Sequence, residues 1–181
     1  MLPHIKNYVN HETWDIQQIN ANAIFEAANI LSKVKKLAGR VFIAGNGGSS
    51  ATASHFANDL RKICHIDATA LSDSIPTLLA YGNDNGWEQM FADSMDTPGA
   101  YDVLIAISCS GASRNVIVAA QKVISVCGHV IVLTGQITPK NKLAILGCPT
   151  IEVKSKDIKI QEDLHLMVCH AIVEALSHAT N

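Results

Sequence analysis

The sequence predicts a doubly wound α/β domain built on a parallel β-sheet, and three observations support this. Short apolar runs without polar alternation, at residues 40–44 and 102–107, are typical of strands buried on both faces. A turn rich in glycine or serine follows each run, and a segment with helical periodicity follows each turn. The 181 residues are 48% hydrophobic, so we expect one domain with a full core over residues 1–181.

The first elements in chain order form a helical extension over about residues 1–38. From Trp14 to Lys36, apolar residues recur at three- and four-residue steps, which predicts one amphipathic helix. Such a helix needs a surface to cover its apolar face, so we expect this N-terminal helix to take part in oligomerisation. The first strand, at residues 40–44, then enters a glycine-rich turn and a helix that continues to about residue 61.

The second half of the chain repeats this order. The strand at 102–107 leads through a serine-rich turn into a helix over about 115–126. Strands are expected at 128–133 and 150–153, and a helix over about 160–177 closes the chain. In parallel sheets of this kind, ligands bind outside the carboxyl ends of the strands, where the polar turns lie.

The composition excludes several kinds of partner. A formal net charge of −2 and a pI near 6.4 provide no field that would attract nucleic acid or an anionic membrane, so neither is expected as a partner. No apolar run approaches the roughly 20 residues of a membrane span, and the first residues lack a signal-peptide layout, so we expect a cytoplasmic protein. Five scattered cysteines without a CxxC pair argue against disulfides and against a cysteine zinc site.

The glycine-rich turn is a candidate anion site. Asn46, Gly47, Gly48 and Ser49 lie where a strand turns into a helix, so backbone amides can approach an anion at the positive end of the helix. The turn matches neither GxGxxG nor GxxxxGK[ST], which disfavours a dinucleotide-binding fold and a P-loop. An ordinary tight turn is the alternative interpretation.

The serine-rich turn strengthens the case for phosphate. Ser108, Ser110 and Ser113 place three hydroxyls within six residues at the start of a helix. A helix N-cap would explain Ser113 but not all three serines. We therefore predict that this turn binds a phosphoryl group.

These motifs together resemble the SIS-domain phosphoheptose isomerases. The resemblance runs from about residue 15 to the C-terminus, with the motifs in the family's order. The matching segments are residues 45–49, 54–59, 81–84, 107–113 and 133–135. The resemblance implies a five-stranded parallel sheet and a homotetramer with active sites shared between subunits. It also implies an aldose–ketose isomerase that converts sedoheptulose 7-phosphate into D-glycero-D-manno-heptose 7-phosphate, for the biosynthesis of heptoses.

The resemblance also implies roles for individual positions. The serine hydroxyls would bind phosphate, Cys109 would contribute its backbone, and Asp84 would lie by the sugar hydroxyls. The implied substrate-binding set is Asn46, Gly47, Gly48, Ser49, Asn83, Asp84, Ser108, Cys109, Ser110, Ser113 and Glu162.

Isomerisation through an enediol needs proton transfer and stabilisation of negative charge. His55 and Asp59, four residues apart, share one face of the helix after the glycine turn. The resemblance implies that His55, Asp59, Glu162 and His170 bind one zinc ion per subunit, with Asp59 and His170 also transferring protons. Imidazole and carboxylate ligands suit zinc.

Several alternatives stay open at this stage. Counting back eight residues from His170 selects Glu162 as the zinc ligand, whereas matching the local sequence of the family motif selects Gln161. Glu162 and Asp163 also suit an ordinary charged helix start, and His165 suits a core histidine. A phosphosugar-binding regulator, of the kind that associates with a replication initiator, and an isomerase of another sugar phosphate are the alternative functions.

Overall fold

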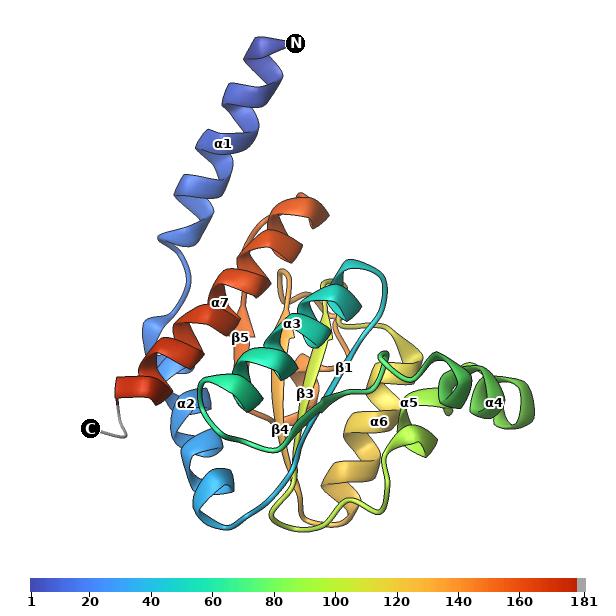
Figure 1. The fold of residues 1–181 in the computed structure, drawn as a ribbon. Coiled ribbons are helices and arrows are strands. Elements are labelled where there is room, and N and C mark those ends of the chain that lie inside the picture. Colours follow the sequence, from blue (N-terminus) through green and yellow to red (C-terminus); the bar gives the residue numbers. More distant parts are fainter. Residues whose placement is uncertain (179–181) are drawn as a thin grey trace.

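The centre of the molecule is a five-stranded parallel sheet with the strand order β2-β1-β3-β4-β5 (Figure 1). Its strands are β1 (Val41–Gly45), β2 (Ala68–Ala70), β3 (Val103–Ser108), β4 (His129–Thr134) and β5 (Thr150–Glu152). This computed structural model describes residues 1–178, except the side chains of Glu12 and Trp14, so residues 179–181 of the predicted domain lie outside the described part. The predicted fold class is confirmed.

Strand residues alternate between two apolar cores. Val41 and Ile43 pack into the core under α2 (Ala21–Lys36), α3 (Gly48–Lys62) and α7 (Ile158–His178). Phe42 and Ala44 face the opposite core, which includes α5 (Met90–Ser94) and α6 (Arg114–Ser125). Burial on both faces explains the solid apolar runs of the sequence.

The chain changes direction across the sheet between β1 and β3. These strands are neighbours, with Gly45 opposite Ile107 in the register. After β1 the chain passes through α3 to β2 at one edge, whereas after β3 it passes through α6 toward the other edge. The loops after β1 and β3 therefore separate around a crevice, which is the ligand-binding point of doubly wound sheets.

The prediction of one helix from Trp14 to Lys36 is wrong. The chain forms α1 (Leu2–Ile16), breaks at residues 17–20, and begins α2 at Ala21. Asn20 fixes the start of α2, because its side-chain oxygen accepts a hydrogen bond from Asn22 N at 3.0 Å and caps the helix. Figure 1 shows α1 projecting beyond the rest of the molecule.

Three further elements were not located from the sequence. β2 is only three residues long, and its Ala-Thr-Ala composition lacks the bulky residues that mark a buried strand. α4 (Ile75–Asn85) has no buried residue and lies at the periphery next to α5 (Figure 1). α5 has only five residues. Within residues 1–178, no helix is long and apolar enough to span a membrane.

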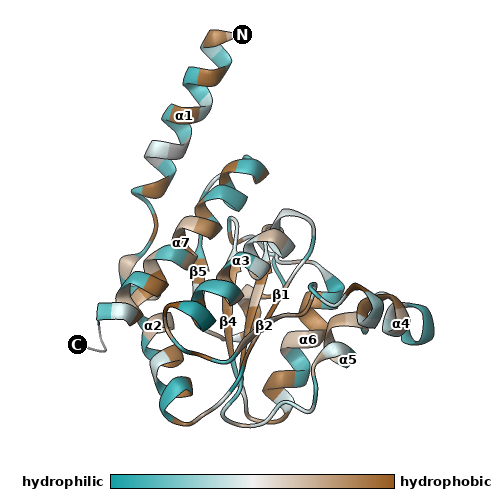
Figure 2. Cartoon of the chain, viewed as in Figure 1, coloured by the Kyte–Doolittle hydropathy of each residue, from teal (hydrophilic) through white to brown (hydrophobic). Residues whose placement is uncertain are grey.

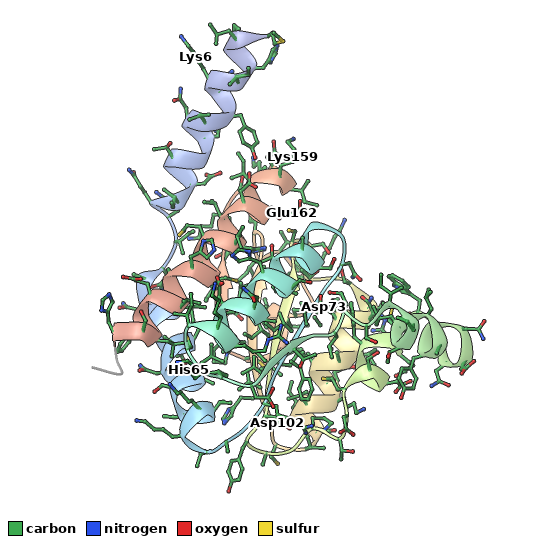
Figure 3. The ribbon with its side chains drawn as sticks, in the orientation of Figure 1. Lys6, His65, Asp73, Asp102, Lys159 and Glu162 are labelled. Carbon is green, nitrogen blue, oxygen red and sulfur yellow. The ribbon has the colours of Figure 1, made fainter. Side chains whose placement is uncertain are left out.

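Asp102 connects the strand starts at the edge of the sheet opposite the two polar loops. Its carboxylate accepts hydrogen bonds from Arg40 N at 2.8 Å, Arg40 Nη2 at 2.8 Å and Gly99 N at 2.9 Å. Burial acts to raise the pKa of Asp102, but the hydrogen bonds and positive charge of Arg40, with the amide of Gly99, outweigh it and lower the pKa. Figure 3 shows Asp102 near the bottom of the α/β body and Glu162 near its top, below the projecting α1.

We expect Asp102→Ala to lower the free energy of unfolding by about 2–4 kcal/mol, because buried amide donors lose a charged acceptor. Denaturant unfolding measures this loss. Because the folded pKa lies below the unfolded value of 3.8, the difference between wild type and variant should be constant well above that pH. It should shrink as the pH falls through 3.8 toward the folded pKa.

The control is Asp96→Ala, since the Asp96 side chain is 91% exposed and lies 3.8 Å from Arg40 Nη1. That variant should change stability by less than about 0.5 kcal/mol. Equal losses for the two variants would contradict the role given to Asp102.

Candidate functional site

A pocket of about 180 Å³ opens at the carboxyl ends of β1 and β3. It brings together residues that lie more than a hundred positions apart in the chain. Its lining contains seven members of the predicted substrate-binding set together with two isoleucines: Asn46, Ser49, Ile107, Ser108, Cys109, Ser110, Ser113, Ile158 and Glu162.

The glycine turn requires small residues because the backbone passes close to itself. A Cβ built on Gly45 would lie 2.7 Å from the Cβ and the backbone oxygen of Ser49. Gly47 has a positive φ of 55°, a conformation that favours glycine. α3 starts at Gly48, and Ser49 N and Ser50 N close its first turn by donating to the carbonyls of Asn46 and Gly47 at 3.0 Å. The amides of Gly47 and Gly48 make no hydrogen bond within the described residues, so they are available to an anion at the positive end of the helix.

The serine turn gathers hydroxyls at the start of α6. Ser108 Oγ lies 3.0 Å from Ser113 Oγ and 3.5 Å from Ser110 Oγ. Ser113 occupies the N-cap position of α6, yet its side chain makes no capping hydrogen bond. The helix-cap interpretation therefore does not account for the Ser113 hydroxyl, which faces the other serines.

A buried network holds the serine turn in place. Thr134 Oγ1 donates to the carbonyl of Ser108 at 2.8 Å, and Asn141 Nδ2 donates to Thr134 Oγ1 at 2.8 Å. Asn141 also leaves no room for a side chain at Gly111, where a built Cβ would lie 1.8 Å from Asn141 Oδ1. Gly111 has a φ of 61°, so both space and conformation require glycine there.

A reciprocal amide pair joins the two turns. Asn46 Nδ2 donates to Asn115 Oδ1 at 3.0 Å, and Asn115 Nδ2 donates to Asn46 Oδ1 at 2.9 Å. Asn115 is fully buried, and its side-chain oxygen also accepts from Val116 N at 3.0 Å. The pair fixes the glycine turn against the first turn of α6.

A cluster of two histidines and one carboxylate lies between α3 and α7. His170 Nε2 lies 3.0 Å from His55 Nε2 and 3.8 Å from Asp59 Oδ2, and His55 Nε2 lies 3.3 Å from Asp59 Oδ2. Both imidazoles are about half exposed, at 49% and 52%, whereas the Asp59 side chain is 15% exposed. The three donor atoms lie within 4.8 Å of one another, as metal ligands require.

Glu162, the fourth predicted ligand, does not lie with this cluster. Its carboxyl group lies against the first turn of α3, where a Cβ built on Gly48 would be 2.5 Å from Glu162 Cδ. Gln161 faces away from the pocket: its Nε2 donates to the carbonyl of Ser155 at 2.7 Å, and its Oε1 lies against Gly135. Of the two candidate registers, the one that selects Glu162 is therefore the one whose side chain enters the site.

Cys109 and His165 form an uncharged contact behind the serine turn. Burial raises the pKa of the Cys109 thiol to about 11, with a further contribution from the negative charge of Glu162. His165 is fully buried with Nδ1 3.9 Å from Cys109 Sγ, and burial lowers the pKa of His165 to about 4. Both side chains are therefore neutral near pH 7, and His165 is a core histidine.

Asn83 and Asp84 lie outside the pocket. Both belong to the peripheral helix α4, where Asn83 Nδ2 donates to Asp84 Oδ1 at 2.9 Å. A larger cavity of about 1010 Å³ lies between α1 and residues 154–160, and neither polar turn lines it. The small pocket carries the predicted chemistry, whereas the large one follows from the projection of α1.

Sequence reasoning missed Asn115 and Asn141, which are both fully buried. A signal existed for Asn115, because it interrupts the apolar face of α6 immediately after the serine turn. Asn141 lies in an irregular segment where no periodicity distinguishes a buried amide from an exposed one.

Comparisons with known proteins agree with this geometry. The SIS domain family profile matches residues 6–135. Phosphoheptose isomerase from Helicobacter hepaticus is 34% identical over 160 residues, covering 85% of this chain and 81% of the relative. The phosphoheptose isomerase from Rhodospirillum rubrum is 34% identical over 162 residues, covering 84% and 83%. The solved phosphoheptose isomerase from Neisseria gonorrhoeae superposes with a TM-score of 0.88 at 27% identity, covering 98% of this chain and 96% of that one.

We expect Asn115→Ala to lower the free energy of unfolding by about 2–3 kcal/mol, because Asn46 loses its buried partner. Inorganic phosphate should also bind more weakly, because the two turns lose their connection. Urea unfolding and calorimetry measure these effects. A double-mutant cycle with Asn46→Ala should show a double variant less destabilised than the sum of the single variants. Strict additivity would mean that the pair does not act as a unit.

We expect iodoacetamide at pH 8 to alkylate exposed Cys127 at least tenfold faster than Cys109 in the folded protein. With a pKa of about 11, only roughly one Cys109 thiol in a thousand is a thiolate at pH 8. The Cys109 rate should therefore keep rising until the pH approaches 11. Peptide mass spectrometry measures both rates, with buried Cys169 as the control for unfolding. Equal rates at pH 8 would contradict the assigned environment.

Proposed function

The chain belongs to the SIS domain family and, within it, to the phosphoheptose isomerases, and from this premise we propose that it converts sedoheptulose 7-phosphate into D-glycero-D-manno-heptose 7-phosphate. One observation carries the proposal. The pocket of serine hydroxyls and helix-start amides lies at one end of α3 and α7, and the His55, Asp59 and His170 cluster lies further along the same two helices.

The phosphoryl group is proposed to bind at the two turns. Ser108, Ser110 and Ser113 offer hydroxyl donors, and the amides of Gly47 and Gly48 offer main-chain donors at the positive end of a helix dipole. Because the protein has a net charge of −2, this local arrangement supplies the attraction that the overall charge does not.

The sugar chain would extend from this pocket along α3. Ser49 lies in the first turn of that helix and His55 six residues later, a rise of about 9 Å at 1.5 Å per residue. An open-chain sugar phosphate can bridge such a separation. The reacting carbons, at the end of the sugar remote from the phosphate, would then lie beside the cluster.

The residues of the cluster fit a zinc ion. Tetrahedral zinc with bonds of about 2.0–2.1 Å places its ligand atoms roughly 3.3 Å apart. The three separations here are 3.0, 3.3 and 3.8 Å. His55, Asp59 and His170 would hold the ion, leaving a coordination position for substrate. A bound zinc would act as a Lewis acid that stabilises the enediolate.

Asp59 and His170 are the proposed proton-transfer groups. Conversion of a ketose into an aldose removes a proton from one carbon and delivers a proton to its neighbour through an enediol, so groups that can accept and donate are both needed. The Asp59 carboxylate on α3 and the His170 imidazole on α7 lie 3.8 Å apart, so both could reach the same part of a substrate.

We also propose the homotetramer that the family resemblance implies, with sites completed by neighbouring subunits. Exposed apolar side chains support it: Leu2, Ile5 and Val9 on α1, and Ile75 and Leu79 on α4. Figure 2 shows hydrophobic stretches on both of these helices. Asp84 lies outside the pocket of its own subunit, so its predicted contact with sugar hydroxyls requires the site of a neighbour.

The test is to incubate zinc-loaded and chelator-treated protein with sedoheptulose 7-phosphate and to follow the aldose product. Turnover that is lost on chelation and restored by zinc supports the proposal. Phosphosugar binding without turnover in either state would favour the regulator instead. Turnover of a six-carbon ketose phosphate in preference to sedoheptulose 7-phosphate would change the assigned substrate.

We expect Ser110→Ala to raise KM by about 10- to 100-fold with a small effect on kcat. The lost hydrogen bond to a charged phosphate contributes about 1.5–3 kcal/mol to binding. Steady-state kinetics measure both constants. Ser125→Ala is the matched control, because Ser125 lies at the far end of α6. An unchanged KM for Ser110→Ala would contradict the phosphate site.

We expect His170→Ala to lower kcat by about 10²–10⁴-fold, the usual contribution of a positioned acid or base, while substrate still binds. Calorimetry with substrate and product assays separate these effects. His178→Ala, which removes an exposed imidazole from the same helix, should behave as wild type. A near-normal rate for His170→Ala would remove His170 from the mechanism.

A further inference from the structure

We propose that Glu162 couples the phosphate pocket to the His55, Asp59 and His170 cluster by moving between them. In the free protein its carboxylate occupies the start of α3, and a phosphoryl group that enters the pocket displaces it toward the cluster, where it completes a zinc site. This proposal rests on the proposed function only in assuming that the chain binds both phosphate and zinc.

The first step of the argument is the position of Glu162 in this structure. Glu162 lines the pocket together with the three serines of the second turn. Its carboxyl group is so close to the start of α3 that Gly48 has no space for a Cβ, which would lie 2.6 Å from either carboxylate oxygen. A negative group there interacts favourably with the positive end of the helix.

The second step is that this position conflicts with a bound phosphate. Among the described residues, Glu162 is the only charged one that lines the pocket of about 180 Å³, and no lysine, arginine or histidine in the lining would offset its charge beside a phosphoryl group. Two anions in contact within a partly buried pocket repel strongly. The phosphoryl group engages several serine hydroxyls as well as the amides, so it would replace the single carboxylate.

The third step is the direction in which Glu162 can move. α3 and α7 run parallel, because Glu162 lies beside Gly48 while His170 lies beside His55 and Asp59. Glu162 and His170 are eight residues apart, which places them within about 80° of one another around the helix axis. Rotation of the long Glu162 side chain toward the C-terminal end of α7 therefore directs its carboxylate toward the cluster.

The fourth step is that the cluster can accept another ligand. It presents three donor atoms, and zinc in catalytic sites can expand from four ligands to five, so a carboxylate can join the site while a position for substrate stays open. A carboxylate displaced from the α3 start would add a fourth protein ligand and a negative charge. Linkage then requires that phosphate strengthens zinc binding and that zinc strengthens phosphate binding by the same factor.

The experiment measures zinc affinity by competition with a chelating dye, with and without saturating inorganic phosphate. For the wild type we expect phosphate to tighten zinc binding by about tenfold, within the usual range of coupling between sites. In Glu162→Ala, phosphate should leave zinc affinity unchanged. The same variant, free of metal, should bind phosphate more tightly than the wild type because no carboxylate competes.

A second variant tests the position of Glu162 directly. Gly48→Ala places a methyl group where the carboxylate lies, and it is compatible with the helix because Gly48 does not have a positive φ. Without phosphate, this variant should bind zinc about tenfold more tightly than the wild type. Adding Glu162→Ala to it should abolish that gain. Glu174→Gln, an exposed change on the same helix, is the charge control and should retain wild-type coupling.

The proposal is overturned if phosphate does not change the zinc affinity of the wild type, or if it still tightens zinc binding in Glu162→Ala. It is also overturned if, without phosphate, Gly48→Ala binds zinc no more tightly than the wild type does. Thermal unfolding confirms that each variant is folded. None of these measurements uses sedoheptulose 7-phosphate. Failure of the coupling between phosphate and zinc can therefore be distinguished from failure of the proposed isomerase activity.

Discussion

The site depends on one constraint, which is that two lengths of backbone must approach a single point at the ends of β1 and β3. Amide groups can converge on an anion only where no side chain stands between them. Close packing against Ser49 and Asn141 excludes a Cβ at Gly45 and Gly111, and Gly47 and Gly111 have positive φ. The strand order brings these turns together, and the Asn46–Asn115 pair holds them in contact. The serine hydroxyls and the histidines can act on one ligand only because the two turns converge at this point.

The parts of the fold that follow from local periodicity could be predicted from sequence. Four strands are within one residue of their expected bounds, because continuous burial leaves a continuous apolar run. β2 left no such signal, since two of its three residues are alanine, which is depleted in strands. The break before α2 was missed because Ile16 and Ile19 continue the apolar spacing, and only the cap at Asn20 marks the end. Periodicity records which face is buried, whereas a cap depends on a single side chain.

The same distinction applies to the site. Spacing on α3 placed His55 and Asp59 on one face, and the family resemblance added His170, which lies 3.0 Å from His55. Sequence spacing could not predict the position of the Glu162 carboxyl group, because a long side chain at the start of a helix can reach more than one partner. Its carboxyl group lies here against the start of α3, where the attraction comes from the helix backbone and not from a side chain that the sequence would reveal. Positions on an element can therefore be predicted from sequence more securely than the conformations of its flexible side chains.

α3 contributes both the amides at Gly48 and the side chains of His55 and Asp59, so one continuous helix sets the spacing between anion and acid–base groups. Its rise of about 1.5 Å per residue does not change when side chains are exchanged. Substitutions can alter the chemistry at either end of the span but cannot lengthen it. An insertion of one residue would also rotate the histidine face by about 100°, so adaptation to a longer or shorter substrate would have to come from outside this helix.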